Sequence, residues 1–183
     1  MRKLAMAFGM LLAGAPGAGA AQLALTSPDI KPGARIADEQ VANGFGCSGK
    51  NVSPALSWSG APKGTRSFAV GVYDADAPNG GGFWHWAMFD IPLDANALAK
   101  NAGDPKAGLA PAGAAQGRND AGTRGYFGPC PPQGDKPHHY LFQVFAVDVD
   151  KLDLDESASP AAVAAELRLH TLAKATLTGL WSR

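Results

Sequence analysis

The sequence predicts a mainly β fold of antiparallel strands, and three observations lead to this prediction. Apolar residues alternate with a period of two over 67–73, 83–91 and 138–147, the pattern of strands with two distinct faces. Clusters of Gly, Pro and Asn separate these runs, as turns between short strands do. Only the stretch after Ser159 has the start and composition of a helix. With 183 residues and 46% hydrophobic content, the chain can bury one core, so a single domain is expected over 21–183.

The first twenty residues have the pattern of an export signal. Arg2 and Lys3 precede the apolar run 4–13, and Ala-Gly-Ala at 18–20 resembles a signal-peptidase site. We therefore expect residues 1–20 to be removed and the mature protein to be periplasmic or secreted. An uncleaved membrane anchor is the alternative, but the run is shorter than the ~20 residues of a membrane span, so no stable membrane insertion is expected.

The charge of the mature chain is close to neutral. Loss of Arg2 and Lys3 reduces the 16 Lys and Arg residues by two, against 16 Asp and Glu, and gives a formal net charge of about −2. A nucleic-acid-binding protein uses a broad basic surface for phosphate contacts, so no nucleic-acid partner is expected.

The chain has two cysteines, Cys47 and Cys130. An exported protein meets an oxidising compartment, in which such a pair can form a disulfide. We expect this disulfide, with two buried free thiols as the alternative.

The N-terminal third is expected to form short strands between turns over 23–58. Within it, residues 47–54 form a loop that lacks the Gly-x-x-x-x-Gly-Lys-Ser/Thr spacing of a phosphate-binding loop, and no helix-forming stretch follows. Strand 67–73 is apolar on both faces and should be central. It runs directly into Asp74 and Asp76, at a strand end where loops often carry function.

Strict alternation over 83–91 assigns its side chains to two faces. It places Phe83, His85 and Ala87 on one side and Trp84, Trp86 and Met88 on the other. Residues 93–127 form the longest irregular stretch, and such a long connection is usually functional or mobile. The segment 128–132, Gly-Pro-Cys-Pro-Pro, should form a stiff rim because proline restricts the backbone. The sequence leaves open whether one of its X-Pro bonds is cis.

The run 138–147 is the strongest strand pattern in the chain, apolar on both faces beyond its polar start. His138 and Tyr140 should point to one side and His139 to the other. A helix is expected from Pro160, capped by Ser159, to about residue 174. Its apolar stripe should pack on the sheet, His170 should have a structural role, and 177–181 should form a last strand or tail. The stripe consists of Val163, Leu167, Leu169 and Leu172.

Four motifs occur in order: Asp-x-Asp-Ala-Pro, Gly-Phe-Trp-His-Trp, Gly-Pro-Cys-Pro-Pro and His-His-Tyr. Together they resemble the phosphatidylethanolamine-binding protein (PEBP) family, specifically its bacterial Raf-kinase-inhibitor-like branch. The similarity extends over most of the mature chain, including residues 51–58 and the late helix. It implies an antiparallel β-sandwich with a few peripheral helices, including one near the C-terminus. It also implies a small cavity that takes phosphate or a phospholipid headgroup.

The resemblance transfers a ligand-binding site to this chain by motif. The matching residues are Asp74, Asp76, Pro78, His85, Gly128, Pro129, Pro131, Pro132, His138 and Tyr140. The chain departs from the family at Ala75, where a proline is usual, and it has no clear counterpart of the C-terminal helix that closes the pocket in animal members.

An anion beside two carboxylates requires a compensating positive charge. We expect Asp74 or Asp76 to hydrogen-bond to His85 or His138 and raise the imidazole pKa, so that the charged ring and the Tyr140 hydroxyl meet the anion. Phosphate binding should then strengthen as the pH falls through the histidine range.

Two other functions use the same residues differently. Asp74, Asp76, His85 and His138 are ligand types of a metal- or His/Asp-dependent hydrolase, but no established hydrolase motif accompanies them. An exposed 93–127 loop would suit a serine protease inhibitor, a role described for the family, whereas a kinase partner does not fit an exported chain. We expect a small-anion-binding protein that is not an enzyme and needs no cofactor.

Overall fold

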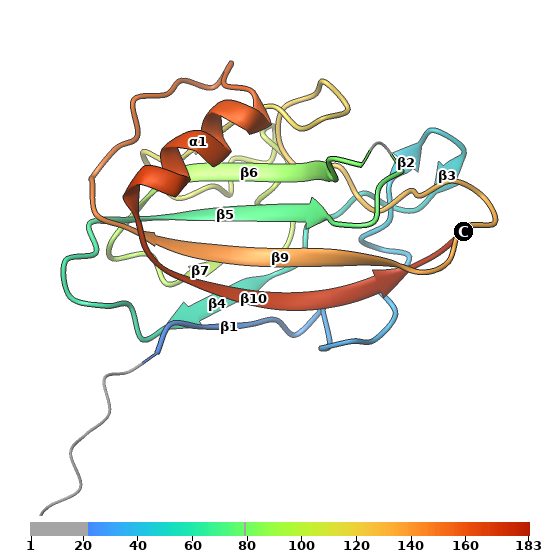
Figure 1. Cartoon of the computed structure of the whole chain (residues 1–183), viewed down its shortest axis with the longest axis horizontal. Coiled ribbons are helices and arrows are strands. Elements are labelled where there is room, and N and C mark those ends of the chain that lie inside the picture. The colour runs from blue at the N-terminus through green and yellow to red at the C-terminus, as the bar shows by residue number, and fades with distance from the viewer. Residues whose placement is uncertain (1–21, 79) are drawn as a thin grey trace, which may run out of the picture.

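The computed structural model of the protein describes residues 22–78 and 80–183 (Figure 1). The predicted signal peptide at 1–20 lies outside these residues. Within them the chain forms ten strands and one helix. In chain order these are β1 (Ala24–Thr26), β2 (Asn43–Gly44), β3 (Cys47–Ser48), β4 (Leu56–Ser59), β5 (Ser67–Asp74), β6 (Phe83–Pro92), β7 (Ala97–Leu98), β8 (Ala115–Gln116), β9 (His138–Val147), α1 (Pro160–His170) and β10 (Thr171–Trp181). The predicted mainly β fold with one helix near the C-terminus is confirmed.

The larger sheet has the strand order β10-β9-β5-β6-β8 and is antiparallel throughout. Strands β5 and β9 both lie in its interior, as their apolar faces predicted. Their register pairs Ser67 with Val147 at one end and Asp74 with Tyr140 at the other. The C-terminal end of β5 and the first residues of β9 therefore lie side by side at the same end of the sheet.

A smaller sheet, β1-β4-β7, packs against one face of the larger sheet (Figure 1). Apolar side chains of both sheets form the main core between them, the dominant favourable term in folding such a domain. The large sheet contributes Val70, Val72, Trp86, Met88, Tyr140, Phe142 and Val144, and the small sheet contributes Leu56, Trp58 and Leu98.

Helix α1 covers the opposite face of the large sheet with a second apolar cluster around Val163 and Leu167. The predicted start is confirmed, because the Ser159 hydroxyl accepts a hydrogen bond from the Ala162 N–H and Pro160 opens the helix. The predicted end near residue 174 is wrong. The chain leaves the helix after His170 and pairs along β9 as the eleven-residue strand β10, because sheet pairing outweighs local helix propensity.

The predicted helical stripe is correct only in its first half. Val163 and Leu167 are buried, whereas Leu169 is 73% exposed and Leu172 belongs to β10. His170 accordingly lies at the end of the helix, where its Nδ1–H donates to Asp148 Oδ1 at 2.9 Å.

Strand β6 contains a β-bulge that breaks the predicted alternation. Val72 pairs with Trp86 and Tyr73 pairs with Trp84, so His85 is the extra residue. Trp84 packs on the helix side over Gly71, where a Cβ atom would lie 2.7 Å from the indole. Trp86 instead joins the main core. The two tryptophans thus lie on opposite faces, and the bulge redirects His85, as bulges near functional sites often do.

Outside the two sheets, the sequence made predictions about the cysteines, the stretch 93–127 and the X-Pro bonds. Cys47 and Cys130 form the predicted disulfide, with Cα atoms 6.0 Å apart. The stretch 93–127 contains only the short strands β7 and β8, yet Leu98 and Gln116 are buried in it. No cis peptide bond occurs among the described residues. Within the same part of the chain, no helix has the length and apolar character needed to cross a membrane.

Candidate functional site

A cavity of about 360 Å³ opens at the end of the large sheet where β5 ends and β9 begins. Side chains from six separate segments of the chain line it, so the fold assembles it from distant parts of the sequence. The lining residues are Phe45, Asp74, Ala77, Pro78, Phe83, His85, Asp120, Ala121, Phe127, Cys130, Pro131, Pro132 and His138.

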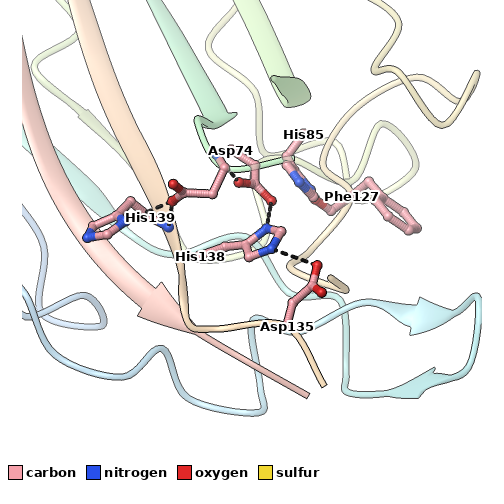
Figure 2. A network of polar contacts seen from close by, with 7 residues as sticks. Asp74, His85, Phe127, Asp135, His138 and His139 are labelled. Carbon is pink, nitrogen blue, oxygen red and sulfur yellow. Dashed lines mark hydrogen bonds and ion pairs between the residues drawn. The ribbon is translucent and has the colours of Figure 1, made fainter. Parts of the chain in front are cut away.

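Asp74 and His138 form a buried pair in the cavity wall (Figure 2). The His138 Nδ1–H donates to Asp74 Oδ2 at 2.8 Å, and the two side chains are only 5% and 4% exposed. Burial lowers the pKa of His138, but the bond and charge of Asp74, followed by those of Asp135, outweigh it and raise the pKa above its ordinary value. The predicted aspartate–histidine pair therefore exists at His138.

His85 lies in the same wall, but its pKa is lowered where that of His138 is raised. Its Nδ1–H donates to the Phe127 carbonyl at 2.8 Å, and the ring stacks on the Phe127 ring. Burial lowers the pKa of His85 to about 4, against the smaller opposing effect of this hydrogen bond. Of the two histidines expected to bond to an aspartate, His138 is the one that does, whereas the charges of Asp74 and Asp120 raise the pKa of His85 by less than burial lowers it.

Asp76 turns away from the cavity. Its Oδ2 accepts from the His139 backbone N–H at 2.7 Å and from His139 Nδ1–H at 2.8 Å, in an exposed pair. These two bonds, the backbone bond first, lower the Asp76 pKa. The backbone N–H of Asp76 nevertheless donates to Asp74 Oδ1 at 2.9 Å. Asp76 thus holds Asp74 in place and does not line the cavity.

Tyr140 lies behind the cavity wall, between the rings of His85 and His138. Its ring contacts His85 edge-on at 5.2 Å between centroids and His138 in a stack at 6.4 Å. The ring is fully buried, its hydroxyl has no hydrogen bond to a described residue, and burial raises its pKa. As predicted, Tyr140 and His138 share a side of β9, which His139 does not.

The proline-rich segment divides into an anchor and a rim. Gly128 donates its N–H to the Asn51 side chain, and Pro129 accepts from the Ala42 N–H. A Cβ atom at Gly128 would lie 2.1 Å from a backbone oxygen, so glycine allows this approach. Pro131 and Pro132 continue to the cavity and line it, as Pro78 does from the other side.

Several lining residues were not assigned to the site from the sequence. Asp120 accepts the Trp84 backbone N–H at 2.7 Å, which joins the irregular stretch to β6. The polar pair Asn-Asp at 119–120, in an Ala- and Gly-rich stretch, is the sequence feature that marks it. Phe45 lies at the turn of the β2–β3 hairpin and packs edge-on against Phe127 at 5.4 Å. No local pattern links Phe45 to this cavity.

The disulfide connects the Phe45 hairpin to the proline rim. Cys47 follows Phe45 in the hairpin, and Cys130 itself lines the cavity. The Arg183 guanidinium donates to the Phe45 carbonyl at 3.1 Å. Both links hold an otherwise exposed aromatic ring at the cavity mouth.

The cavity combines one ionisable cluster with apolar walls. Asp74, Asp120 and His138 supply charge or hydrogen bonds, while aromatic and proline rings supply the remaining surface. Among residues 22–78 and 80–183, no group of three or more His, Cys, Asp or Glu side chains is placed to hold a metal ion.

The chain is similar to known proteins over most of its length. The family model described as "Phosphatidylethanolamine-binding protein" matches residues 26–182. The chain is 47% identical over 162 residues to the UPF0098 protein YbcL of Escherichia coli, covering 88% of each chain. It is 41% identical over 158 residues to the UPF0098 protein YbhB of the same organism, covering 86% of this chain and 99% of that one.

A mycobacterial relative and a solved structure are also similar to this chain. A Mycobacterium tuberculosis relative, 35% identical over 164 residues that cover 90% of this chain and 74% of that one, is named a putative lipoprotein, LppC. The crystal structure of E. coli YbcL, described as a new member of the mammalian PEBP family, has a TM-score of 0.87 and 46% identity. It covers 89% of this chain and 99% of that one.

Proposed function

Because the chain belongs to the phosphatidylethanolamine-binding protein family, we propose that it binds phosphate or a phosphorylated headgroup in the cavity lined by Asp74, His85 and His138. One observation carries this proposal. The His138 imidazole lies buried against Asp74 and borders an otherwise largely apolar cavity. A positive ring in such surroundings attracts an anion more strongly than it would in water.

The two histidines contribute differently to this binding. His85 donates its one N–H to Phe127, so it meets a ligand as a neutral ring with an acceptor nitrogen. His138, whose pKa is raised, is the ionisable donor of the cavity wall. We therefore assign the anion's principal charge contact to His138.

The cavity carboxylates select which anion can bind. Asp74 and Asp120 would repel a fully ionised oxyanion. A phosphate monoester has a second pKa near ~6, so an increasing share of it carries a P–OH group as the pH falls through this value. That group donates to a carboxylate while another phosphate oxygen accepts from His138, and repulsion becomes a hydrogen bond. Sulfate has no such donor in this pH range.

Calorimetric titration with phosphate and sulfate between pH 5 and 8 tests this arrangement. Phosphate affinity should rise as the pH falls, because protonation of His138 and of phosphate both favour binding. His85, with a pKa of about 4, stays neutral over the whole range. Sulfate should bind more weakly than phosphate at each pH. A phosphate affinity that is constant or increases with pH, or a preference for sulfate, contradicts the proposal.

A parallel titration with O-phosphoethanolamine, a monoester that keeps the P–OH group, tests whether the ethanolamine end of a headgroup adds to binding. Tighter binding than that of inorganic phosphate would show that the ethanolamine end is recognised, while equal binding would identify phosphate itself as the recognised group.

The same geometry favours binding over hydrolysis. Among the cavity-lining residues there is no serine or threonine, and the sulfur of Cys130 is in the disulfide. The wall therefore presents no hydroxyl or thiol nucleophile. A phosphoesterase and esterase screen checks this proposal, and activity that is abolished by Asp74→Asn would contradict it.

We also propose an extracytoplasmic location. The disulfide is typical of proteins from oxidising compartments, the N-terminal sequence has the pattern of an export signal, and one relative is named a putative lipoprotein. Mass spectrometry of the protein from its native cells should find a chain that starts near Ala21. A retained Met1 would contradict cleavage.

A further inference from the structure

Each of the two nitrogens of the His138 ring bonds to a carboxylate. The proposed function assigns a role to Asp74 and none to the second carboxylate, Asp135. Nδ1–H donates to Asp74 Oδ2 at 2.8 Å, and Nε2–H donates to Asp135 Oδ2 at 3.3 Å (Figure 2). An ionised carboxylate only accepts hydrogen bonds, so the two bonds together require a doubly protonated ring.

The two carboxylates are held with different firmness. Asp74 is buried, and its second oxygen accepts the Asp76 backbone N–H at 2.9 Å. Asp135 lies on the turn before β9 with its side chain 40% exposed, next to Gly134 at a φ of 90°. Its bond to His138 is also the longer one. Asp74 is therefore the permanent partner of the ring, and Asp135 is the partner that can exchange with solvent or ligand.

An anion that binds His138 in the cavity needs a free imidazole N–H. The cavity wall contains the rings of His138 and His85, but the Nδ1–H of His85 is used by Phe127. Asp74 occupies the Nδ1–H of His138, so the Nε2–H is the imidazole donor that remains for a ligand. In this structure Asp135 occupies it.

Building on the proposed function, we infer that Asp135 is an intramolecular competitor that sets the affinity of the site. Its carboxylate takes the position on His138 Nε2–H that the phosphate group takes in the complex, and the bound phosphate displaces it into solvent. The charged groups around His138 are then Asp74 and the phosphate, with Asp120 in the same cavity. Only phosphate groups that bind the ring better than this tethered carboxylate are retained.

Asp135→Asn tests the competition because it removes the charge but keeps the size of the side chain. The dissociation constant for inorganic phosphate at pH 5.5 should fall by about 3- to 10-fold, the range expected for loss of a partly exposed ion pair and its repulsion of the ligand. Asp94→Asn is the matched control. Asp94 is exposed beyond the far end of β6, so its removal changes the net charge equally without touching the cavity.

The variants and probes separate this inference from the proposed function. Tighter phosphate binding by Asp135→Asn but not by Asp94→Asn supports the competitor. Unchanged or weaker binding by Asp135→Asn, with the wild type still binding phosphate, overturns the inference and leaves the proposed function in place. Absence of phosphate and O-phosphoethanolamine binding by both proteins between pH 5 and 8 overturns both. A gain with either probe supports the competitor.

A second measurement follows the displacement in the wild-type protein. Saturation with inorganic phosphate should shift the side-chain carboxyl ¹³C resonance of Asp135, and the shift should titrate with the calorimetric dissociation constant. A resonance that does not move while phosphate binds would show that Asp135 stays on His138 and would overturn the inference.

Discussion

Two aspartate–histidine pairs lie next to each other in this protein, share the same histidine-to-carboxylate contact and differ in their surroundings. Asp74–His138 and Asp76–His139 join the same two strand ends, each with a histidine Nδ1 to carboxylate distance of 2.8 Å. The first pair is 4–5% exposed and lines the cavity, whereas the side chains of the second are 44% and 56% exposed and face solvent. Alternation along β9 separates the two histidines, whereas Asp76 lies in the turn that follows the end of β5 at Asp74.

This difference shows that the surroundings of a pair, and not only its hydrogen bond, set its electrostatic strength. In water an ion pair gains little, because solvent competes with each partner. In the cavity wall the same contact replaces lost hydration and keeps the ring charged. His85 completes the comparison: it is buried without a carboxylate, and its pKa falls to about 4. Burial and pairing together therefore decide the charge of each histidine.

The largest expected effect comes from removing one carboxylate of each pair. Asp74→Asn should lower the free energy of unfolding at pH 6 by about 3–5 kcal/mol, because it leaves a buried partner uncompensated. Asp76→Asn should lower it by less than about 1 kcal/mol. The raised pKa of His138 means that its stabilisation is complete below the unfolded-state value near ~6.5 and is lost as the pH rises through the folded-state value. Urea unfolding measures both variants, and equal effects would show that burial does not distinguish the pairs.

His85 gives the next largest effect, with the opposite dependence on pH. Its folded pKa of about 4 lies below the unfolded value, so the unfolded chain binds the extra proton between these values and stability falls as the pH decreases. Wild-type protein should lose about 3 kcal/mol more than His85→Asn between pH 7 and pH 4. Asparagine can keep the hydrogen bond to the Phe127 carbonyl, and carboxylate titrations are common to both proteins. Parallel pH–stability curves would contradict a neutral, buried His85.

The smallest effect concerns the exposed pair and salt. A double-mutant cycle on Asp76 and His139 should give a coupling free energy below about 0.5 kcal/mol that disappears in 1 M NaCl, where the screening length is about 3 Å. The coupling between Asp74 and His138 should persist in the same salt because both side chains are at most 5% exposed. A salt-sensitive inner pair would indicate that water and ions enter the cavity wall.

Much of the fold could be predicted because its causes are local. Alternation placed β5 and β9 in the interior of the sheet and separated His139 from His138, and Ser159 with Pro160 marked the start of α1. The errors arise where distant pairing overrides a local pattern. Strand β10 begins at Thr171 because it pairs with β9, and the bulge at His85 separates Trp84 from Trp86.

The candidate site was predictable only in part. The motifs identified both members of the inner pair and much of the rim, but Asp76 faces solvent and Tyr140 lies behind the wall. Asp120 is marked only by the polar pair at 119–120, and Phe45 enters the cavity from a segment whose own sequence pattern does not indicate it.

The sequence by itself determined the strand faces, the helix start and the residue types gathered at the ends of β5 and β9. These depend on neighbours a few residues apart, which periodicity and capping express directly. Only the tertiary structure decided which aspartate meets which histidine, because those contacts join residues 63 and 64 positions apart. It also decided that the pKa of His138 is raised and that the pKa of His85 is lowered. The free energy of a charge depends on what surrounds it in space.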